Sequence, residues 1–200
     1  MVINMFYRHI FPTSFGYAGI LFQTRPFLVK RILLPHWNKA GLLARTASCS
    51  EKKRAGFTQD LSPCPKEEVP GECLRLSANI QAYFRGKPIK TNWTFLDITG
   101  LTPLQHSVLE AVADVAYGEV KTYSEIAAEI GRPRAARFVG TTLASNPFPV
   151  LIPCHRIIRA DGSAGGFSGG TNLKERLLTL ERRLFCTHRR PCSGLQHRVE

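Results

Sequence analysis

The sequence predicts an α+β protein in two parts: a small amino-terminal part with a β-sheet and one helix, and a mostly helical carboxy-terminal part with a helix-turn-helix. Two observations lead to this prediction. Apolar runs of strand length occur early in the chain, whereas from residue 101 onward apolar residues recur at helical spacing behind helix-start signals. We place the parts at residues 1–97 and 98–185, and a basic tail at 186–200.

Two strands are predicted near the amino terminus. The stretches "SFGYAGILF" (14–22) and "PFLVKRILLP" (26–35) have strand-like composition, with a turn at "QTRP" (23–26) between them. The first fifty residues carry basic side chains but no Asp or Glu, a composition that is also typical of an organellar leader. The two strand-like runs favour a folded sheet over a cleaved leader. No apolar run approaches the roughly 20 residues that a membrane span needs.

The rest of the amino-terminal part alternates between polar and apolar stretches. Residues 46–71 are polar, charged and Pro-containing, which predicts a loop or linker. The stretch "LRLSANIQAYFRG" (74–86) predicts an amphipathic helix, and "TNWTFLDIT" (91–99) resembles a strand. The predicted apolar side of the helix consists of Leu76, Ile80 and Tyr83 or Phe84.

Capping boxes open two predicted helices in the carboxy-terminal part. Thr102 is followed by Pro103 at the first helical position and by Gln105 three residues after the cap. Thr122 and Glu125 repeat the pattern in "TYSE". Apolar residues at helical spacing follow both boxes.

A third helix is predicted directly after the second. Gly131 can adopt the left-handed conformation that ends a helix, and Pro133 then starts "PRAARFVGTTLAS" (133–145). Two short helices joined in this way form a plausible helix-turn-helix, whose second helix would lie on DNA. That helix is small and basic, since Arg134 and Arg137 stand among several Ala and Gly residues. The alternative is a pair of packed helices with a solvated basic face.

The composition favours a polyanionic partner. The chain has 200 residues and a formal net charge of +12, an excess that suits DNA, RNA or an anionic membrane. A merely solvated basic surface is the alternative. The six cysteines form no CxxC pair and indicate a reducing compartment. No ligand spacing supports a metal site, and we expect no cofactor.

A possible nucleophile stands in "LIPCHRII" (151–158), where Cys154 precedes His155 and Arg156. A cysteine becomes nucleophilic when its thiolate is stabilised and a neighbouring base accepts the proton. Adjacent side chains of an extended chain point opposite ways, so a bridging water could carry the proton. Glu181, at the margin of the apolar face of a helix that begins near residue 171, is the candidate carboxylate to orient His155. A buried structural cysteine beside a surface histidine is the alternative.

The loop "RADGSAGGFSGG" (159–170) follows this segment. Its small residues would let the backbone approach a flat ligand closely, and Phe167 and Ser168 stand among them. A flexible surface turn is the alternative, although such a turn rarely needs a central Phe followed by Ser-Gly-Gly.

The stretch "NPFPVLIPCHRIIRADGSAGGFSGGTNLKERLLTLE" (146–181) resembles the active-site region of the O6-alkylguanine-DNA alkyltransferases, the methylated-DNA–protein-cysteine methyltransferases. Upstream, "TPLQHSVLEAVADVAYGEVKTYSEIAAEIGRPRAARFVGTTLASNP" (102–147) is similar to the DNA-binding segment of that family. The resemblance covers about residues 98–183. The amino-terminal part resembles the family's variable domain only loosely.

The resemblance implies DNA repair by irreversible, stoichiometric transfer of an alkyl group from O6 of guanine, or from O4 of thymine, to Cys154. His155 would take the thiol proton through a water, and Glu181 would orient His155. Arg156 would be a structural brace, and Asn146 would fix the turn between the DNA-reading helix and the active-site segment.

The resemblance also implies how DNA is bound. The target base must leave the stack, and Arg137 matches the family's arginine finger that fills the space left behind. Tyr123 matches the tyrosine that pushes the target phosphate and later serves the leaving O6. The second helix would enter the minor groove of double-stranded DNA. The expected DNA-binding residues are Thr122, Tyr123, Arg134, Ala135, Ala136 and Arg137. The expected pocket residues are Val150, Ile152, Phe167, Ser168 and Gly169.

Two alternatives to alkyl transfer stay open. One is a non-catalytic module that recognises alkylated DNA, and the other is a basic helix-turn-helix regulator. A regulator usually needs a dimer face to read two half-sites, and the sequence shows no extra apolar helix for one. We expect a monomer without membrane contact. It would be cytoplasmic in a prokaryote and nuclear in a eukaryote, with an organellar leader left open.

Overall fold

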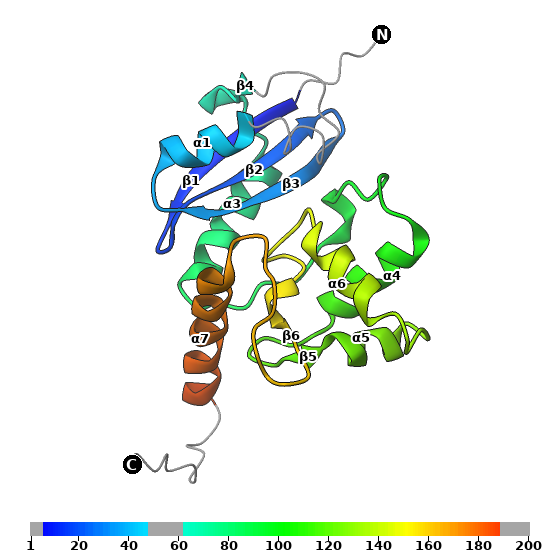
Figure 1. The fold of residues 1–200 in the computed structure, drawn as a ribbon. Coiled ribbons are helices and arrows are strands. Elements are labelled where there is room, and N and C mark those ends of the chain that lie inside the picture. Colours follow the sequence, from blue (N-terminus) through cyan, green and yellow to red (C-terminus); the bar gives the residue numbers. More distant parts are fainter. Residues whose placement is uncertain (1–5, 48–61, 189–200) are drawn as a thin grey trace.

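The amino-terminal part of the computed structural model is a four-stranded sheet in the order β3-β2-β1-β4 (Figure 1). The structure describes residues 6–47 and 62–188. The strands are β1 (Phe6–Thr13), β2 (Gly16–Thr24), β3 (Phe27–His36) and β4 (Ser62–Pro63). β1, β2 and β3 are antiparallel, and β4 lies parallel to β1. The two predicted strands are confirmed as β2 and β3, whereas β1 and β4 were not predicted.

Helices cover both faces of this sheet. They are α1 (Lys39–Ala47) and α3 (Gly71–Phe84). Because neighbouring side chains of a strand point to opposite faces, Leu21 and Leu33 pack with Leu42 of α1, while Ile20 and Phe22 join the main core with α3. The sheet is therefore buried on two sides, which explains why its central strands read as nearly continuous apolar runs.

Three sequence predictions for the amino-terminal part need correction. This part was predicted to have one helix, but it contains α1 in addition to α3. Residues 46–71 are not a continuous loop: 48–61 lie outside the described residues, and the remainder contains the end of α1, β4, a 3₁₀ turn at Lys66–Glu68 and the first residue of α3. Residues 91–99 form no strand. The Asn92 side chain accepts a hydrogen bond from the Thr94 N–H and opens a 3₁₀ turn at Trp93–Phe95, so the backbone pairs with the sheet only through Leu96.

The carboxy-terminal part is mostly helical. Its helices are α4 (Pro103–Ala113), α5 (Tyr123–Glu129), α6 (Ala136–Ala144) and α7 (Thr171–His188). Both predicted capping boxes are confirmed, at Thr102 and at Thr122. Gly131 ends α5 with a φ of 68°. Helix α6 begins at Ala136 rather than at Pro133, because the preceding residues form a turn in which the Ala135 N–H donates to the Arg132 carbonyl.

One hydrophobic core connects the two parts. Its buried members include Ile20 and Phe22 of the sheet, Tyr83 of α3, and Leu173 and Leu177 of α7. Figure 1 shows α7 returning from the carboxy-terminal part to lie next to the end of α3. The predicted α+β class is confirmed. None of the helices in the described ranges has both the length and the apolar character needed to cross a membrane.

Candidate active site

A strained turn positions Cys154. Val150 has a φ of 76°, which is unusual for a β-branched residue, and the chain then enters a 3₁₀ turn at Cys154–Arg156. Asn146 braces this turn on two sides. Its Nδ2 donates to the Ile152 carbonyl at 3.0 Å, and its Oδ1 accepts from the Phe148 N–H at 2.9 Å. These bonds stabilise the otherwise unfavourable conformation.

A two-stranded parallel pairing joins the helix-turn-helix to the same segment. Strand β5 (Lys121–Thr122) directly precedes α5, and strand β6 (Ile157–Ile158) directly follows the 3₁₀ turn. Thr122 pairs with Ile158, so the first residue of α5, Tyr123, lies beside the segment that contains Cys154. This pairing fixes the position of α5 and α6 relative to Cys154.

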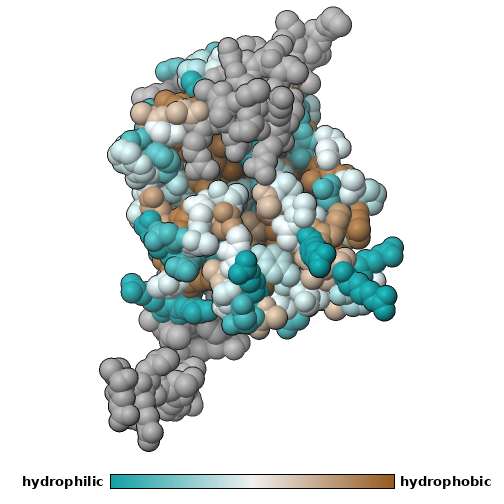
Figure 2. Space-filling view, viewed as in Figure 1, coloured by the Kyte–Doolittle hydropathy of each residue, from teal (hydrophilic) through white to brown (hydrophobic). Residues whose placement is uncertain are grey.

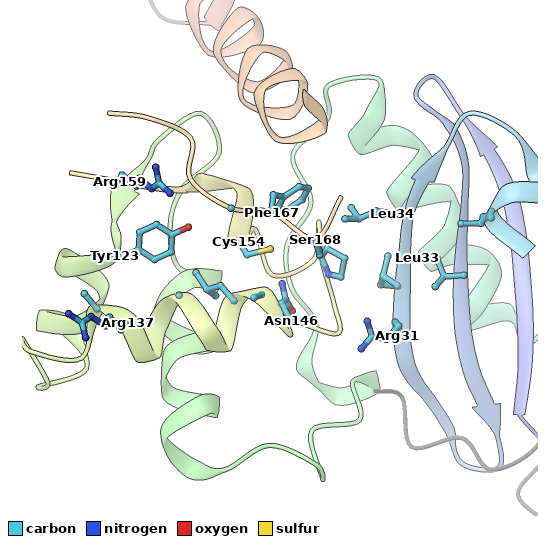
Figure 3. A pocket seen from close by; sticks show the side chains of 18 residues that line it. Arg31, Leu33, Leu34, Tyr123, Arg137, Asn146, Cys154, Arg159, Phe167 and Ser168 are labelled. Carbon is cyan, nitrogen blue, oxygen red and sulfur yellow. The ribbon is translucent and has the colours of Figure 1, made fainter. Parts of the chain in front are cut away.

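Cys154 faces a cavity of about 650 Å³. In Figure 3 its sulfur lies near the middle of the lining, with Tyr123 and Arg159 on one side and Leu33 and Leu34 of β3 on the other. The lining residues come from β3, α1, α5, α6, the turn after α6 and the glycine-rich loop. They are Arg31, Ile32, Leu33, Leu34, Leu42, Tyr123, Ala136, Arg137, Gly140, Leu143, Ala144, Asn146, Pro149, Cys154, Arg159, Gly166, Phe167 and Ser168.

Some predicted pocket and DNA residues lie outside this lining. Val150 and Ile152 are buried behind it, where they belong to the core. Gly169 packs instead against the side chains of Leu34 and Leu173. The contact is close enough to require glycine, because an added Cβ would lie 2.9 and 2.7 Å from them. Among the predicted DNA-binding residues, Thr122, Arg134 and Ala135 do not line the cavity, whereas Tyr123, Ala136 and Arg137 do.

Behind Cys154 lies a group of four buried polar side chains that we call the Glu181 cluster: Tyr83, His155, Arg156 and Glu181. Oε1 of Glu181 lies 2.8 Å from His155 Nε2 and 3.1 Å from Arg156 Nη2, and it accepts the Tyr83 hydroxyl at 2.6 Å. Oε2 accepts from Arg156 Nε at 2.9 Å and from the Gly118 N–H at 3.1 Å. The buried carboxylate is therefore fully hydrogen-bonded, as a buried charge requires.

Burial sets the protonation states at the site. It raises the pKa of the Cys154 thiol, although a hydrogen bond with Asn146 and the charge of Lys174 act in the opposite direction. It also lowers the pKa of His155, against the hydrogen bond and charge of Glu181. Burial alone would raise the pKa of Glu181, but His155 and Arg156 together bring it down to about 2. Near neutral pH the resting site therefore pairs a thiol with a neutral imidazole beside a carboxylate.

Sequence reasoning missed Tyr83 and Lys174, as well as the part of the cavity wall that β3 and α1 supply. Tyr83 comes from α3, far from the motif in sequence, and only the fold could reveal its contacts. Lys174 is fully buried on α7, and its Nζ donates to the Ile157 carbonyl. Burial lowers the pKa of Lys174 to about 8. The sequence did contain a signal that Lys174 is buried. It shares one helix face with Leu177 and Glu181, at spacings of three and four residues.

The outer side of the cavity is basic and exposed. We use the name α6 face for three residues: the exposed Arg134 in the turn before α6, and the partly buried Ala136 and the exposed Arg137 in the first turn of α6. Figure 3 places Arg137 at the edge of the cavity, beyond Tyr123. Hydrophilic side chains also project from the lower half of the view in Figure 2. Within the described ranges neither arginine forms a salt bridge, so both guanidinium groups are available to an anion.

Comparisons with known proteins agree with this geometry. Residues 103–183 match the family described as "6-O-methylguanine DNA methyltransferase, DNA binding domain". The methylated-DNA–protein-cysteine methyltransferase of Methanothermobacter thermautotrophicus is 38% identical over 146 residues, covering 72% of this chain and 76% of that protein.

Solved structures extend the similarity over both parts of the molecule. The crystal structure of the Mycobacterium tuberculosis O6-methylguanine methyltransferase superimposes with a TM-score of 0.66 at 29% identity, covering 90% of this chain and 94% of that one. A structure of the M. tuberculosis protein in complex with DNA has a TM-score of 0.63 at 28% identity, covering 88% and 93%. The chain therefore belongs to the methylated-DNA–protein-cysteine methyltransferase family.

Proposed function

We propose that this protein repairs alkylated DNA by moving one alkyl group from O6 of guanine, or O4 of thymine, to the sulfur of Cys154. DNA repair by alkyl transfer is the activity of the family. The observation that carries the assignment to Cys154 is its position: it is 4% exposed, it faces the cavity, and the residue after it belongs to the Glu181 cluster.

The transfer is a displacement at carbon. The sulfur of Cys154 forms a bond to the alkyl carbon while the bond from that carbon to O6 breaks, and the electron pair of the broken bond goes to the guanine. The thiol proton passes to His155, the leaving guanine accepts a hydrogen bond as its charge develops, and the step is balanced when the imidazolium gives up its proton and the guanine gains one. Glu181 stabilises the imidazolium that His155 becomes when it holds the thiol proton. The product is a thioether without an easy hydrolytic exit, so each molecule acts once.

Two groups of the cavity can serve the leaving base. The Tyr123 hydroxyl lies beside the glycine-rich loop, where a Cβ on Gly165 would be 3.2 Å from it. Burial raises the pKa of Tyr123, so the hydroxyl keeps its proton and can donate it as a hydrogen bond. Ser168 lines the same cavity, and Phe167 supplies an aromatic wall for the base.

The α6 face is the proposed entrance for DNA. The target base is inside the duplex and has to be turned out before it can reach Cys154. Arg137 would fill the gap in the stack, while the small residue Ala136 lets α6 approach the minor groove. We further propose that Thr122, Arg134 and Ala135 contact the DNA backbone outside the cavity, and that the protein acts as a monomer in the compartment that holds DNA.

Intact-protein mass spectrometry tests the proposal. After incubation with a duplex that contains O6-methylguanine, we expect the protein to gain the mass of one methyl group in place of one hydrogen, and never more. Cys154→Ala should abolish the gain while DNA binding stays nearly intact. Cys64→Ala is the matched control, since this half-buried cysteine does not line the cavity. Sustained turnover, or an unchanged gain in Cys154→Ala, would overturn the assignment. DNA binding without any gain would instead support a recognition module.

A further inference from the structure

The Glu181 cluster contains one residue from outside the alkyltransferase segment. Tyr83 lies on α3, and its side chain is completely buried. Its hydroxyl oxygen is 2.6 Å from Glu181 Oε1 and 3.0 Å from His155 Nε2, although these residues are 98 and 72 positions away in sequence. The amino-terminal part therefore reaches the proposed catalytic base directly.

The direction of each hydrogen bond in this group can be worked out. Glu181 is ionised, so its Oε1 accepts only, and the single proton of the Tyr83 hydroxyl goes to it. Burial keeps the pKa of Tyr83 well above its usual value, so that proton stays in place. The oxygen atoms of Tyr83 and Glu181 that face His155 Nε2 can then only accept from it.

This arrangement determines the tautomer of His155. Because two acceptors face Nε2, the neutral imidazole carries its hydrogen there, and Nδ1 keeps its lone pair. Nδ1 is buried, and no protein group of the described residues hydrogen bonds with it. Nδ1 is thus the nitrogen that can receive the thiol proton in the proposed reaction.

We infer that Tyr83 is a positioning residue of the alkyl transfer, which holds the hydrogen of His155 on Nε2 and the Glu181 carboxylate against it, so that Nδ1 stays free as the base. The inference rests on the proposed function. It also gives the amino-terminal part a direct role in the chemistry, beyond packing against the carboxy-terminal helices.

The charged and titratable groups around Tyr83 are few. His155 and Glu181 contact its hydroxyl, Arg156 acts on it through its charge, and the Tyr117 ring packs edge-on at 6.2 Å. The Tyr117 hydroxyl donates to the Gly86 carbonyl at 3.3 Å. Tyr117 is therefore a matched control: it is an aromatic neighbour whose hydroxyl points elsewhere.

The test compares the full-length wild type with Tyr83→Phe and Tyr117→Phe. The first readout is the single-turnover rate of methyl transfer from duplex DNA as a function of pH. In Tyr83→Phe we expect a rate that is roughly three- to tenfold lower near neutral pH, the size of one lost hydrogen bond. The deficit should shrink at high pH, where the thiol ionises without a base. Tyr117→Phe should follow the wild type.

The second readout is the nitrogen-15 NMR spectrum of His155, which distinguishes the two neutral tautomers. We expect Nε2 to carry the hydrogen in the wild type and the two nitrogen shifts to move toward each other in Tyr83→Phe. Unchanged shifts with superimposable rate profiles would refute the inference, as would a rate loss that is equal at every pH, because that indicates packing alone. If Tyr83→Phe does not fold, the wild-type spectrum decides, since a hydrogen on Nδ1 contradicts the inference. A wild type that transfers no methyl group would instead refute the proposed function.

Discussion

The Glu181 cluster and the α6 face are both charged, but they differ in burial and in whether their charges have partners within the protein. In the cluster every charge has a partner: Glu181 accepts from Tyr83, His155 and Arg156, and none of them is more than a few per cent exposed. On the α6 face, Arg134 and Arg137 are exposed and form no salt bridge within the described residues. The charges of the first region are paired within the protein, whereas the arginines of the second can be paired only by a bound anion. Substitutions in the cluster should therefore change both the stability of the protein and the rate of alkyl transfer. Substitutions on the α6 face should change only the steps that involve DNA, which are binding and base extrusion.

The strongest test of this contrast is Glu181→Gln, which keeps the shape of the side chain and removes its charge. The variant leaves Arg156 as an unpaired buried cation, so we expect a loss of about 3–5 kcal/mol in the free energy of unfolding. We also expect methyl transfer to slow roughly 100-fold, with much of the deficit recovered at high pH, because general-base assistance is lost. Thermal melting and single-turnover rates against pH measure the two effects.

A double variant separates the two losses. Adding Arg156→Met removes the unpaired cation, so stability should partly return while the rate stays low. If the rate returned together with stability, Glu181 would act only as a structural partner of Arg156. If Glu181→Gln alone showed the wild-type rate profile, the proposed relay through His155 would be wrong.

The next effect in size concerns Arg137. In Arg137→Ala we expect the reaction with duplex DNA to slow roughly tenfold, because turning out the base costs a few kcal/mol that the arginine offsets. The reaction with free O6-benzylguanine should be unchanged, since no base has to leave a stack. Single-turnover rates on both substrates give the comparison, and equal losses on both would mean that Arg137 supports the fold.

Arg134→Ala is the matched control for this experiment. Arg134 is exposed on the same face but does not line the cavity. Arg134→Ala should leave the ratio of the duplex rate to the free-base rate unchanged. It should reduce the slope of log affinity against log salt concentration by about 1, the value expected for one lost phosphate contact. A change in the rate ratio would show that extrusion is a property of the whole face.

Sequence reasoning succeeded where the signal is local. Capping boxes at Thr102 and Thr122 and the left-handed Gly131 depend on residues a few positions apart, and the structure confirms all three. It failed where the deciding contact is distant. No local pattern shows that Tyr83 reaches Glu181, 98 positions away. The failure at 91–99 has a different cause: strand-like composition outweighed a local signal, the Asn92 side chain that accepts from the Thr94 N–H and opens a 3₁₀ turn. The motif could indicate Cys154, His155 and Glu181, but the wall of the cavity supplied by β3 depends on how the two parts pack.

The smallest expected effect is a pH dependence of stability that belongs to the cluster and not to the face. Burial lowers the pKa of His155 below the value of about 6.5 that it has in the unfolded chain. Above that value both states are neutral at this residue, so His155 adds no penalty. As the pH falls below it, the unfolded state binds a proton that the folded state does not, and stability falls by at most about 1.4 kcal/mol per pH unit. The melting temperature should therefore drop by a few degrees between pH 7 and pH 5.

Two variants test whether the fall in melting temperature at low pH comes from His155. His155→Gln should remove part of it, while the remainder comes from other groups, including His9, whose pKa burial also lowers. Arg137→Ala should melt with the wild-type pH dependence, because it changes an exposed side chain outside the Glu181 cluster. If His155→Gln kept the full drop, the folded protein would accept the proton on His155 at pH 5. Burial would then not hold the imidazole neutral in acid, and Nδ1 could serve as the base for Cys154 only at a pH above the ordinary pKa of histidine.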